Sequence, residues 1–258
     1  MMRHLDSDQE QSPVVVQWLH DLVVFRGASR PLFCSTDLVL RDAFLAELQQ
    51  CDQSDDVRVV VLAGFPEKTG RGEYEAFYRA ALTGDNRLAL RRMLNVFNQL
   101  ILAIVQLSKP VIFVDGGRIL SQFFNVGLAC DYRILSSSTV IERAYLRHGM
   151  LPKGGGAWFL SKVLGRHRAF QLLLSDGDVT AQRARELGLV DEVVPDERLN
   201  EAGLAAARRF SALPASTVGG IKRLLRFDLA ELSDYLAMEN DEILKAASSS
   251  DLAAVGWS

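Results

Sequence analysis

The chain has 258 residues, 48% of them hydrophobic, and a formal net charge of −3. This length and composition predict one large domain with a substantial core and room for a smaller appended part. Charges of both signs are spread along the chain, so we expect neither a nucleic-acid-binding surface nor an acidic disordered tail. Cys34, Cys51 and Cys130 match no zinc-binding spacing and are expected to be free, buried thiols in a reducing compartment.

The first twelve residues, MMRHLDSDQEQS, are polar and lack the apolar segment of a secretory signal. We interpret residues 1–12 as a disordered lead. The longest apolar stretches, such as LILAIVQL, are too short by themselves to cross a bilayer. We therefore expect a protein of the cytoplasm with no membrane partner.

The first half of the chain alternates strand and helix patterns. The predicted strands are VVVQWL and DLVVF as a pair, then VRVVVLAG, VIFVD and YRILS. The predicted helices cover 37–51, with Asp37 or Thr36 as N-cap, 86–107 and 120–129. A loop with Pro66, Gly70 and Gly72 follows VRVVVLAG. Continuous apolar strands separated by helices favour an α/β fold with right-handed crossovers.

The strand signal fades after Gly156. Helices are predicted over 167–177, 180–188, 197–210 and 216–245. The expected organisation is therefore a lead at 1–12, an α/β core at 13–195 and a helical C-terminal region at 196–258.

Four segments, in order, resemble the crotonase superfamily, the enoyl-CoA hydratase and isomerase proteins. They are DDVRVVVLAG (55–64), KPVI…GG…LACDYRI (109–134), HGMLPKGGGAWFL (148–160) and LLLSDGDVTAQRARELGLVDEVVP (172–195). The resemblance covers roughly residues 20 to 256. It implies a crotonase-like spiral of repeated strand-turn-helix units, with a helical C-terminal region used for trimerisation.

The resemblance also implies an acyl-thioester site with an oxyanion hole built from two backbone N–H groups. Arg71, just before Gly72, aligns with the first donor, and Gln122 aligns with the second. Gly72, Glu73, Gly117 and Arg143 are the substrate-binding candidates. Where the family has a run of three glycines, this chain has Ser121-Gln122-Phe123, so we expect a narrower pocket or a reshaped turn. No cofactor is implied beyond CoA as part of the substrate, and no metal.

Hydratases of the family use two glutamates as general acid and base. Asn125 and Tyr145 stand at those two positions, and neither is a carboxylate. Tyr145 is either a proton donor to an enolate or a packed aromatic. Asn125 either orients water or a thioester oxygen, or satisfies local backbone groups.

Three further residues are candidates for the site. His148 is a proton-transfer candidate, with packing as the alternative. If 142–145 is a strand, Arg143 and Tyr145 share a face, and Arg143 either pairs with a substrate carboxylate or forms a salt bridge within the fold. Glu73 is the other carboxylate expected near the site. Gly154-Gly155-Gly156 is interpreted as a structural turn, since no Lys-Ser/Thr pair follows it.

Two hypotheses remain open. The chain is an enzyme acting on an acyl thioester, carried by CoA or a carrier protein, through enolate stabilisation without hydratase activity, for example as a decarboxylase. Alternatively, it is a non-catalytic helper with the same fold. In either case we expect a homotrimer or hexamer.

Overall fold

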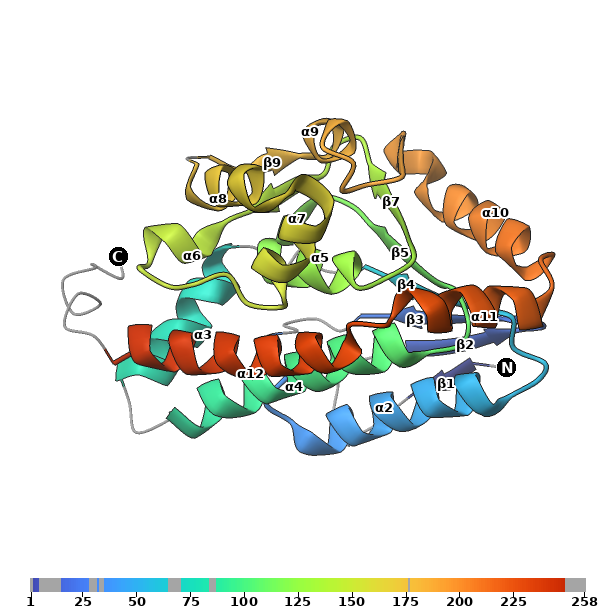
Figure 1. The fold of residues 1–258 in the computed structure, drawn as a ribbon, viewed down its shortest axis with the longest axis horizontal. Coiled ribbons are helices and arrows are strands. Elements are labelled where there is room, and N and C mark those ends of the chain that lie inside the picture. Colours follow the sequence, from blue (N-terminus) through green and yellow to red (C-terminus); the bar gives the residue numbers. More distant parts are fainter. Residues whose placement is uncertain are drawn as a thin grey trace.

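A computed structural model describes residues 2–4, 15–27, 32, 35–64, 71–83, 87–175 and 177–248. For residues 2–4, Arg71 and Thr83 it describes the backbone alone. The described chain forms two sheets surrounded by helices (Figure 1).

The main sheet has seven strands in the order β1-β2-β3-β4-β5-β7-β10. These are β1 (Met2–His4), β2 (Val15–Leu19), β3 (Leu22–Arg26), β4 (Val59–Ala63), β5 (Val111–Asp115), β7 (Tyr132–Ser136) and β10 (Glu192–Val194). The first three strands pair antiparallel, and from β3 onward every pair is parallel. The apolar runs VVVLA and VIFVD form its centre because both of their faces are buried.

A smaller sheet, in the order β6-β8-β9, lies beside the main one. Its strands are β6 (Arg118–Leu120), β8 (Val140–Glu142) and β9 (Val179–Thr180). β6 follows β5 through the turn at Gly116-Gly117, and the Gly117 carbonyl accepts a hydrogen bond of 2.8 Å from Val140 N. Gly117 has a φ of 73°, which favours glycine. This sheet carries the chain from the end of β5 into the helices that form the candidate site.

Helices cover both faces of the main sheet (Figure 1). The N-terminal helices are α2 (Leu38–Gln53), α3 (Arg71–Thr83), α4 (Arg87–Gln106), α5 (Ser121–Leu128) and α6 (Ala144–Arg147). The others are α7 (Gly156–Leu164), α8 (Arg166–Leu174), α9 (Ala181–Glu186), the 3-10 turn η1 (Asp196–Arg198), α10 (Leu199–Ser211), α11 (Ala215–Leu225) and α12 (Leu229–Ala246). α10 packs on β4, β5 and β7, and α12 lies along α4. The C-terminal region therefore completes the core rather than standing apart from it.

The expected strand pair is confirmed as β2 and β3, and the expected helix after it is α2. Asp37 is its N-cap, with Oδ1 accepting hydrogen bonds from Val39 N (2.8 Å) and Leu40 N (3.2 Å). Cys51 and Cys130 are confirmed as free and buried, and burial raises the pKa of both thiols. Cys34 lies outside the described residues.

Several expectations were wrong in detail. Gly72 belongs not to a loop but to α3, because Tyr74, Phe77, Tyr78 and Ala81 bury one face at helical spacing. The helix expected at 216–245 is divided into α11 and α12 by a turn at 226–228. Residues 2–4 are not disordered but pair with the edge of β2, and 5–12 lie outside the described residues.

α4 is, among the described helices, the one long and apolar enough to cross a membrane. Its apolar residues have another partner, because Leu90, Met93, Leu94, Phe97, Ile101 and Ile104 are buried in the core. Its composition is therefore explained by packing against α2, α3 and α12.

Candidate active site

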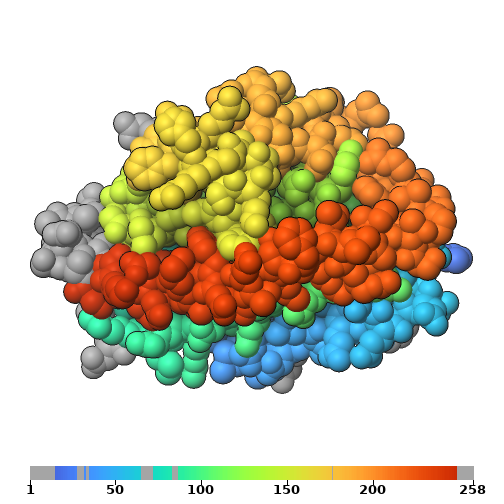
Figure 2. Space-filling model, viewed as in Figure 1, coloured from blue at the N-terminus to red at the C-terminus, as the bar shows by residue number. Residues whose placement is uncertain are grey.

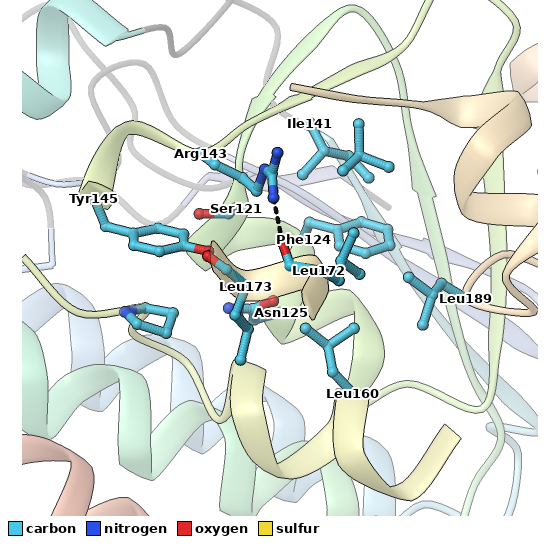
Figure 3. Close-up of a pocket in the computed structure, with 12 residues that line it drawn as sticks. Ser121, Phe124, Asn125, Ile141, Arg143, Tyr145, Leu160, Leu172, Leu173 and Leu189 are labelled. Atoms are coloured by element: carbon cyan, nitrogen blue, oxygen red, sulfur yellow. Dashed lines mark hydrogen bonds between the residues drawn. The ribbon is translucent and has the colours of Figure 1, made fainter. Parts of the chain in front are cut away.

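The candidate site is assembled where β5, β6 and β8 end. β5 ends at Asp115, β6 runs into α5 at Ser121, and β8 runs into α6 at Ala144. The turn containing Gly154 and Gly155 lies against α5: a Cβ added at Gly154 would be 2.9 Å from the Gln122 carbonyl oxygen. Asn125, Arg143 and Tyr145, which are distant in sequence, thereby line one pocket (Figure 3).

The pocket has a volume of about 30 Å³, room for no more than a few water molecules. Its polar side chains are Ser121, Asn125, Arg143 and Tyr145. The rest of its wall is apolar and consists of Phe124, Ile141, Pro152, Leu160, Leu172, Leu173, Val179 and Leu189. The pocket that these described residues enclose is therefore small and mostly apolar.

Asn125 contacts the turn that contains Gly154, Gly155 and Gly156, called here the glycine turn. Its Nδ2 donates a 2.8 Å hydrogen bond to the Lys153 carbonyl, and a Cβ added at Gly156 would be only 2.4 Å from Nδ2. An ionised glutamate could not donate this bond. The contacts therefore favour the interpretation that Asn125 satisfies backbone groups.

Tyr145 lies on α6, and its ring points toward Leu173 (Figure 3). The hydroxyl donates a hydrogen bond of 3.0 Å to the Leu173 carbonyl. Burial raises the pKa of the phenol above its ordinary value, with the Arg143 guanidinium acting in the opposite direction. Tyr145 is thus a neutral phenol whose proton is directed at a main-chain oxygen.

Arg143 is buried, and its guanidinium binds two main-chain carbonyls and a hydroxyl rather than an acid. It donates to the carbonyls of Leu172 and Gly177 and, at 2.9 Å, to Ser175 Oγ. The strand expected over 142–145 ends at Glu142, and α6 begins at Ala144. Arg143 and Tyr145 nevertheless line the same pocket, because the backbone turns between them.

His148 has a partner that the sequence did not indicate. Its Nε2 lies 3.3 Å from Glu75 Oε1, and its ring stacks on Tyr74 with 5.7 Å between centroids. Tyr74 stacks in turn on Tyr78 at 4.3 Å. Glu75 was missed because the segment was interpreted as a loop, whereas on α3 it lies one position past Tyr74 and reaches the histidine.

The two expected oxyanion donors both stand at helix N-termini. Arg71 is the first residue of α3 and Gln122 the second of α5, and N–H groups in a first turn have no acceptor within their helix. The Gln122 side chain is buried, and Phe123 packs against Phe97 with 5.4 Å between ring centroids. The side chains of Gln122 and Phe123 do not line the pocket.

The remaining candidates have local contacts. Glu73 Oε1 accepts a 2.8 Å hydrogen bond from Leu32 N, so it binds the chain ahead of α2. A Cβ added at Gly72 would meet nothing within 4 Å, so space does not require a glycine there. Among the described residues, no cluster of three His, Cys, Asp or Glu side chains offers a metal site.

Asp115 is a second group that the sequence did not single out. Its carboxyl is buried at the end of β5, directly against Gly64, where an added Cβ would be 1.8 Å from Oδ1. Oδ1 accepts a hydrogen bond from Gly116 N (2.7 Å), and Oδ2 has no hydrogen-bond partner in the described part of the chain. Burial raises its pKa to about 7. The sequence correctly predicted that Asp115 is buried as part of VIFVD. It did not predict the raised pKa, because that depends on the groups around the carboxyl.

Comparison with known proteins agrees with this fold and these motifs. A family model described as enoyl-CoA hydratase/isomerase matches residues 30–251. The chain therefore belongs to the enoyl-CoA hydratase/isomerase family, within the crotonase superfamily.

Individual relatives span different chemistries. The 1,2-epoxyphenylacetyl-CoA isomerase of Escherichia coli is 29% identical over 214 residues, covering 81% of this chain and 80% of that protein. The trans-2-decenoyl-[acyl-carrier-protein] isomerase of Streptococcus mutans is 30% identical over 121 residues, covering 47% and 46%. The crystal structure of an enoyl-CoA hydratase from Bacillus halodurans superposes with a TM-score of 0.81 at 20% identity, covering 95% and 98%.

Proposed function

We propose that this chain binds an acyl thioester and stabilises the enolate formed from it with the backbone N–H groups of Arg71 and Gln122. The observation that carries the proposal is the position of both groups in the first turn of a helix. Such N–H groups lack intrahelical acceptors and lie at the positive end of the helix dipole. Preorganised donors of this kind typically supply a large share of the catalysis of enolate-forming reactions.

The reaction we propose is not hydration. Asn125 and Tyr145 carry no charge, and each donates its hydrogen bond to a main-chain carbonyl. A decarboxylation fits this site better, because loss of CO₂ leaves the electron pair on the α-carbon without a base. The thioester carrier is CoA or a carrier protein; the Escherichia coli relative is named for a CoA substrate and the Streptococcus mutans relative for a carrier-protein substrate.

A non-catalytic helper is the second candidate function. It is favoured by the small volume, about 30 Å³, of the pocket that Asn125 and Tyr145 line. In that case the chain would bind partners or thioesters without converting them.

A thermal-shift screen against a panel of acyl-CoAs, including malonyl-type thioesters, separates the two functions when each reaction is followed by mass spectrometry. The enzyme hypothesis expects at least one thioester to raise the melting temperature and to be converted. Binding without conversion across the panel would favour the helper, and no binding at all would contradict the proposed ligand class.

A further inference from the structure

A second cavity, of about 210 Å³, lies at the amino ends of the central strands of the main sheet, opposite the candidate active site. Arg58 comes just before β4, and Ser108, Lys109 and Pro110 come just before β5, so the cavity opens at the amino ends of these strands. The candidate active site follows their carboxyl ends. Five residues of strand separate the two edges by roughly 15 Å. α11, which closes the cavity, lies at the right of Figure 1.

Three cations line this cavity and no carboxylate does. They are Arg58, Lys109 and Arg223, and none of them forms an ion pair with a residue that the structure describes. Arg58 donates to the Leu213 carbonyl and Lys109 Nζ to the Ser54 carbonyl (3.0 Å). By contrast, the neighbouring Lys222 is paired with Asp131. The cavity is therefore lined by three cations and by no carboxylate of the described residues.

The first turn of helix α11 adds to this charge. Ala215 and Ser216 form the first turn of α11, an eleven-residue helix without a side-chain cap, and both line the cavity. The N–H groups of that turn have no acceptor within the helix. Ser108 also lines the cavity, but its N and Oγ both donate to Asp52 Oδ1 at 2.7 Å and are not free for a ligand. Asp52 Oδ1 is therefore already hydrogen-bonded to Ser108.

The remaining wall is apolar and is formed by Pro110, Phe210, Leu213 and Val218. We propose that this cavity is a binding site for a phosphate monoester of a small apolar or aromatic group, separate from the thioester site. A dianion matches three cations and a helix N-terminus better than a single carboxylate does, and arginine forks bind phosphate oxygens in pairs. The cavity has room for several water molecules, more than a phosphate group alone would occupy.

Calorimetric titration of the whole chain with phenyl phosphate, inorganic phosphate and benzoate tests the site. Phenyl phosphate is expected to bind with one-to-one stoichiometry and more tightly than the other two. Arg223→Gln should weaken it by about tenfold or more, as expected for loss of a charge-assisted hydrogen bond. Arg223 makes no hydrogen bond in the described structure beyond its helix backbone, so the variant should fold normally, as circular dichroism would check.

Arg168→Gln is the matched control, because Arg168 is an exposed cation on α8 far in sequence from the cavity. It removes the same charge and should leave phenyl phosphate binding unchanged. If both variants bound phenyl phosphate equally weakly, the effect would be one of net charge, and the proposal would be overturned. Absence of saturable binding at millimolar phenyl phosphate would overturn it as well, and benzoate binding as tightly as phenyl phosphate would overturn the assignment to phosphate. None of these outcomes depends on thioester activity.

Discussion

Asn125 and Tyr145 stand where relatives with hydratase chemistry are expected to place two carboxylates. A carboxylate pair takes and gives a proton, whereas an amide and a neutral phenol held on carbonyl oxygens cannot do both. Since each proton-transfer group contributes roughly 10² to 10⁴-fold, we predict negligible hydration of crotonyl-CoA. Loss of its absorbance in the presence of the protein checks this. A rate comparable to an ordinary hydratase would reveal another acid, for which the pair of Glu75 and His148 is a candidate.

Tyr145→Phe isolates the hydroxyl group. If the phenol donates a proton to an enolate, turnover of a thioester found by the screen should fall by roughly 10²-fold or more. If the hydroxyl serves only the Leu173 carbonyl, turnover should hold and stability should fall by about 1 kcal/mol. Steady-state kinetics and urea unfolding of the same variant distinguish the two. Unchanged turnover would remove Tyr145 from the catalytic residues and leave His148 as the next candidate.

The buried Asp115 carboxyl predicts a pH-dependent stability. Its pKa is about 7 in the folded protein against 3.8 as the ordinary value. Between these values the unfolded chain releases a proton that the folded chain keeps, so the free energy of unfolding should fall as pH rises from about 4 to 7 and level off above. The full effect is at most about 4 kcal/mol.

Asp115→Asn should remove most of this slope, because the amide stays neutral and its oxygen can still accept the Gly116 N–H bond. Urea unfolding at pH 5 and pH 8 measures the difference, with the variant gaining relative to wild type at pH 8. Parallel pH profiles for the two proteins would show that the carboxyl is already ionised in the fold.

The elements that the sequence predicted well are those with strong periodicity or continuous burial. VVVLA, VIFVD and the apolar periodicity of α4 left no competing interpretation. α3 was missed because Gly70 and Gly72 signal a loop, although the spacing of Tyr74, Phe77, Tyr78 and Ala81 indicates a helix. β6, β8 and β9 are two or three residues long and exist through pairing with distant segments, which a single sequence does not display.

The candidate site was predictable in its frame but not in its contacts. Motif spacing located Gln122, Asn125, Arg143 and Tyr145 in one region, and the last three line one pocket. The partners of these side chains are main-chain carbonyls on α8 and on the glycine turn. Every residue has a main-chain carbonyl, so no sequence pattern indicates which carbonyl a side chain will bind.

Helix α12 and the glycine turn are joined by a buried ion pair. Lys153 Nζ lies 2.7 Å from Glu239 Oε2 and 2.8 Å from Asn240 Oδ1, and Glu239 also accepts from Gly154 N and Gly155 N. Both charged side chains are almost entirely buried. The turn's N–H groups are thus committed to a carboxylate of the same chain, which confirms its structural interpretation.

Glu239→Gln should leave the Lys153 cation buried without a counter-charge. We predict a loss of about 3 kcal/mol or more in the free energy of unfolding. Glu242→Gln on the same helix is the control, because its pair with Lys245 is exposed to solvent and should contribute far less. Chemical denaturation compares them. Equal losses would show that the buried pair contributes no more than a surface pair.

At the scale of the molecule, four exposed apolar residues lie together on and just after α11. Ile221, Leu224, Leu225 and Phe227 are all more than half exposed, whereas α12 buries Leu232, Leu236 and Ile243 against the core. α11 and α12 cross one surface as a continuous band (Figure 2). Exposed apolar side chains grouped in this way are typical of an interface.

We predict a trimer or a dimer of trimers assembled through this region. Sedimentation at micromolar concentration measures it, and a stable monomer would contradict the prediction. Leu224→Glu should shift the protein toward monomer, because a charge buried in an interface is costly. Val39→Glu, at an equally exposed apolar position on α2, should leave the assembly intact.

The ion pair between Lys153 and Glu239 also has a consequence for the order in which the chain folds during synthesis. The anion that neutralises this lysine lies 86 positions later in the chain. While a ribosome is still making α12, the nascent chain holds Lys153 and the apolar face of α4 without their partners. Contacts between distant segments close late, and exposed apolar surface in the meantime invites aggregation. Truncation within α12 would therefore leave the chain in this unfinished state, as a target for chaperones and proteases.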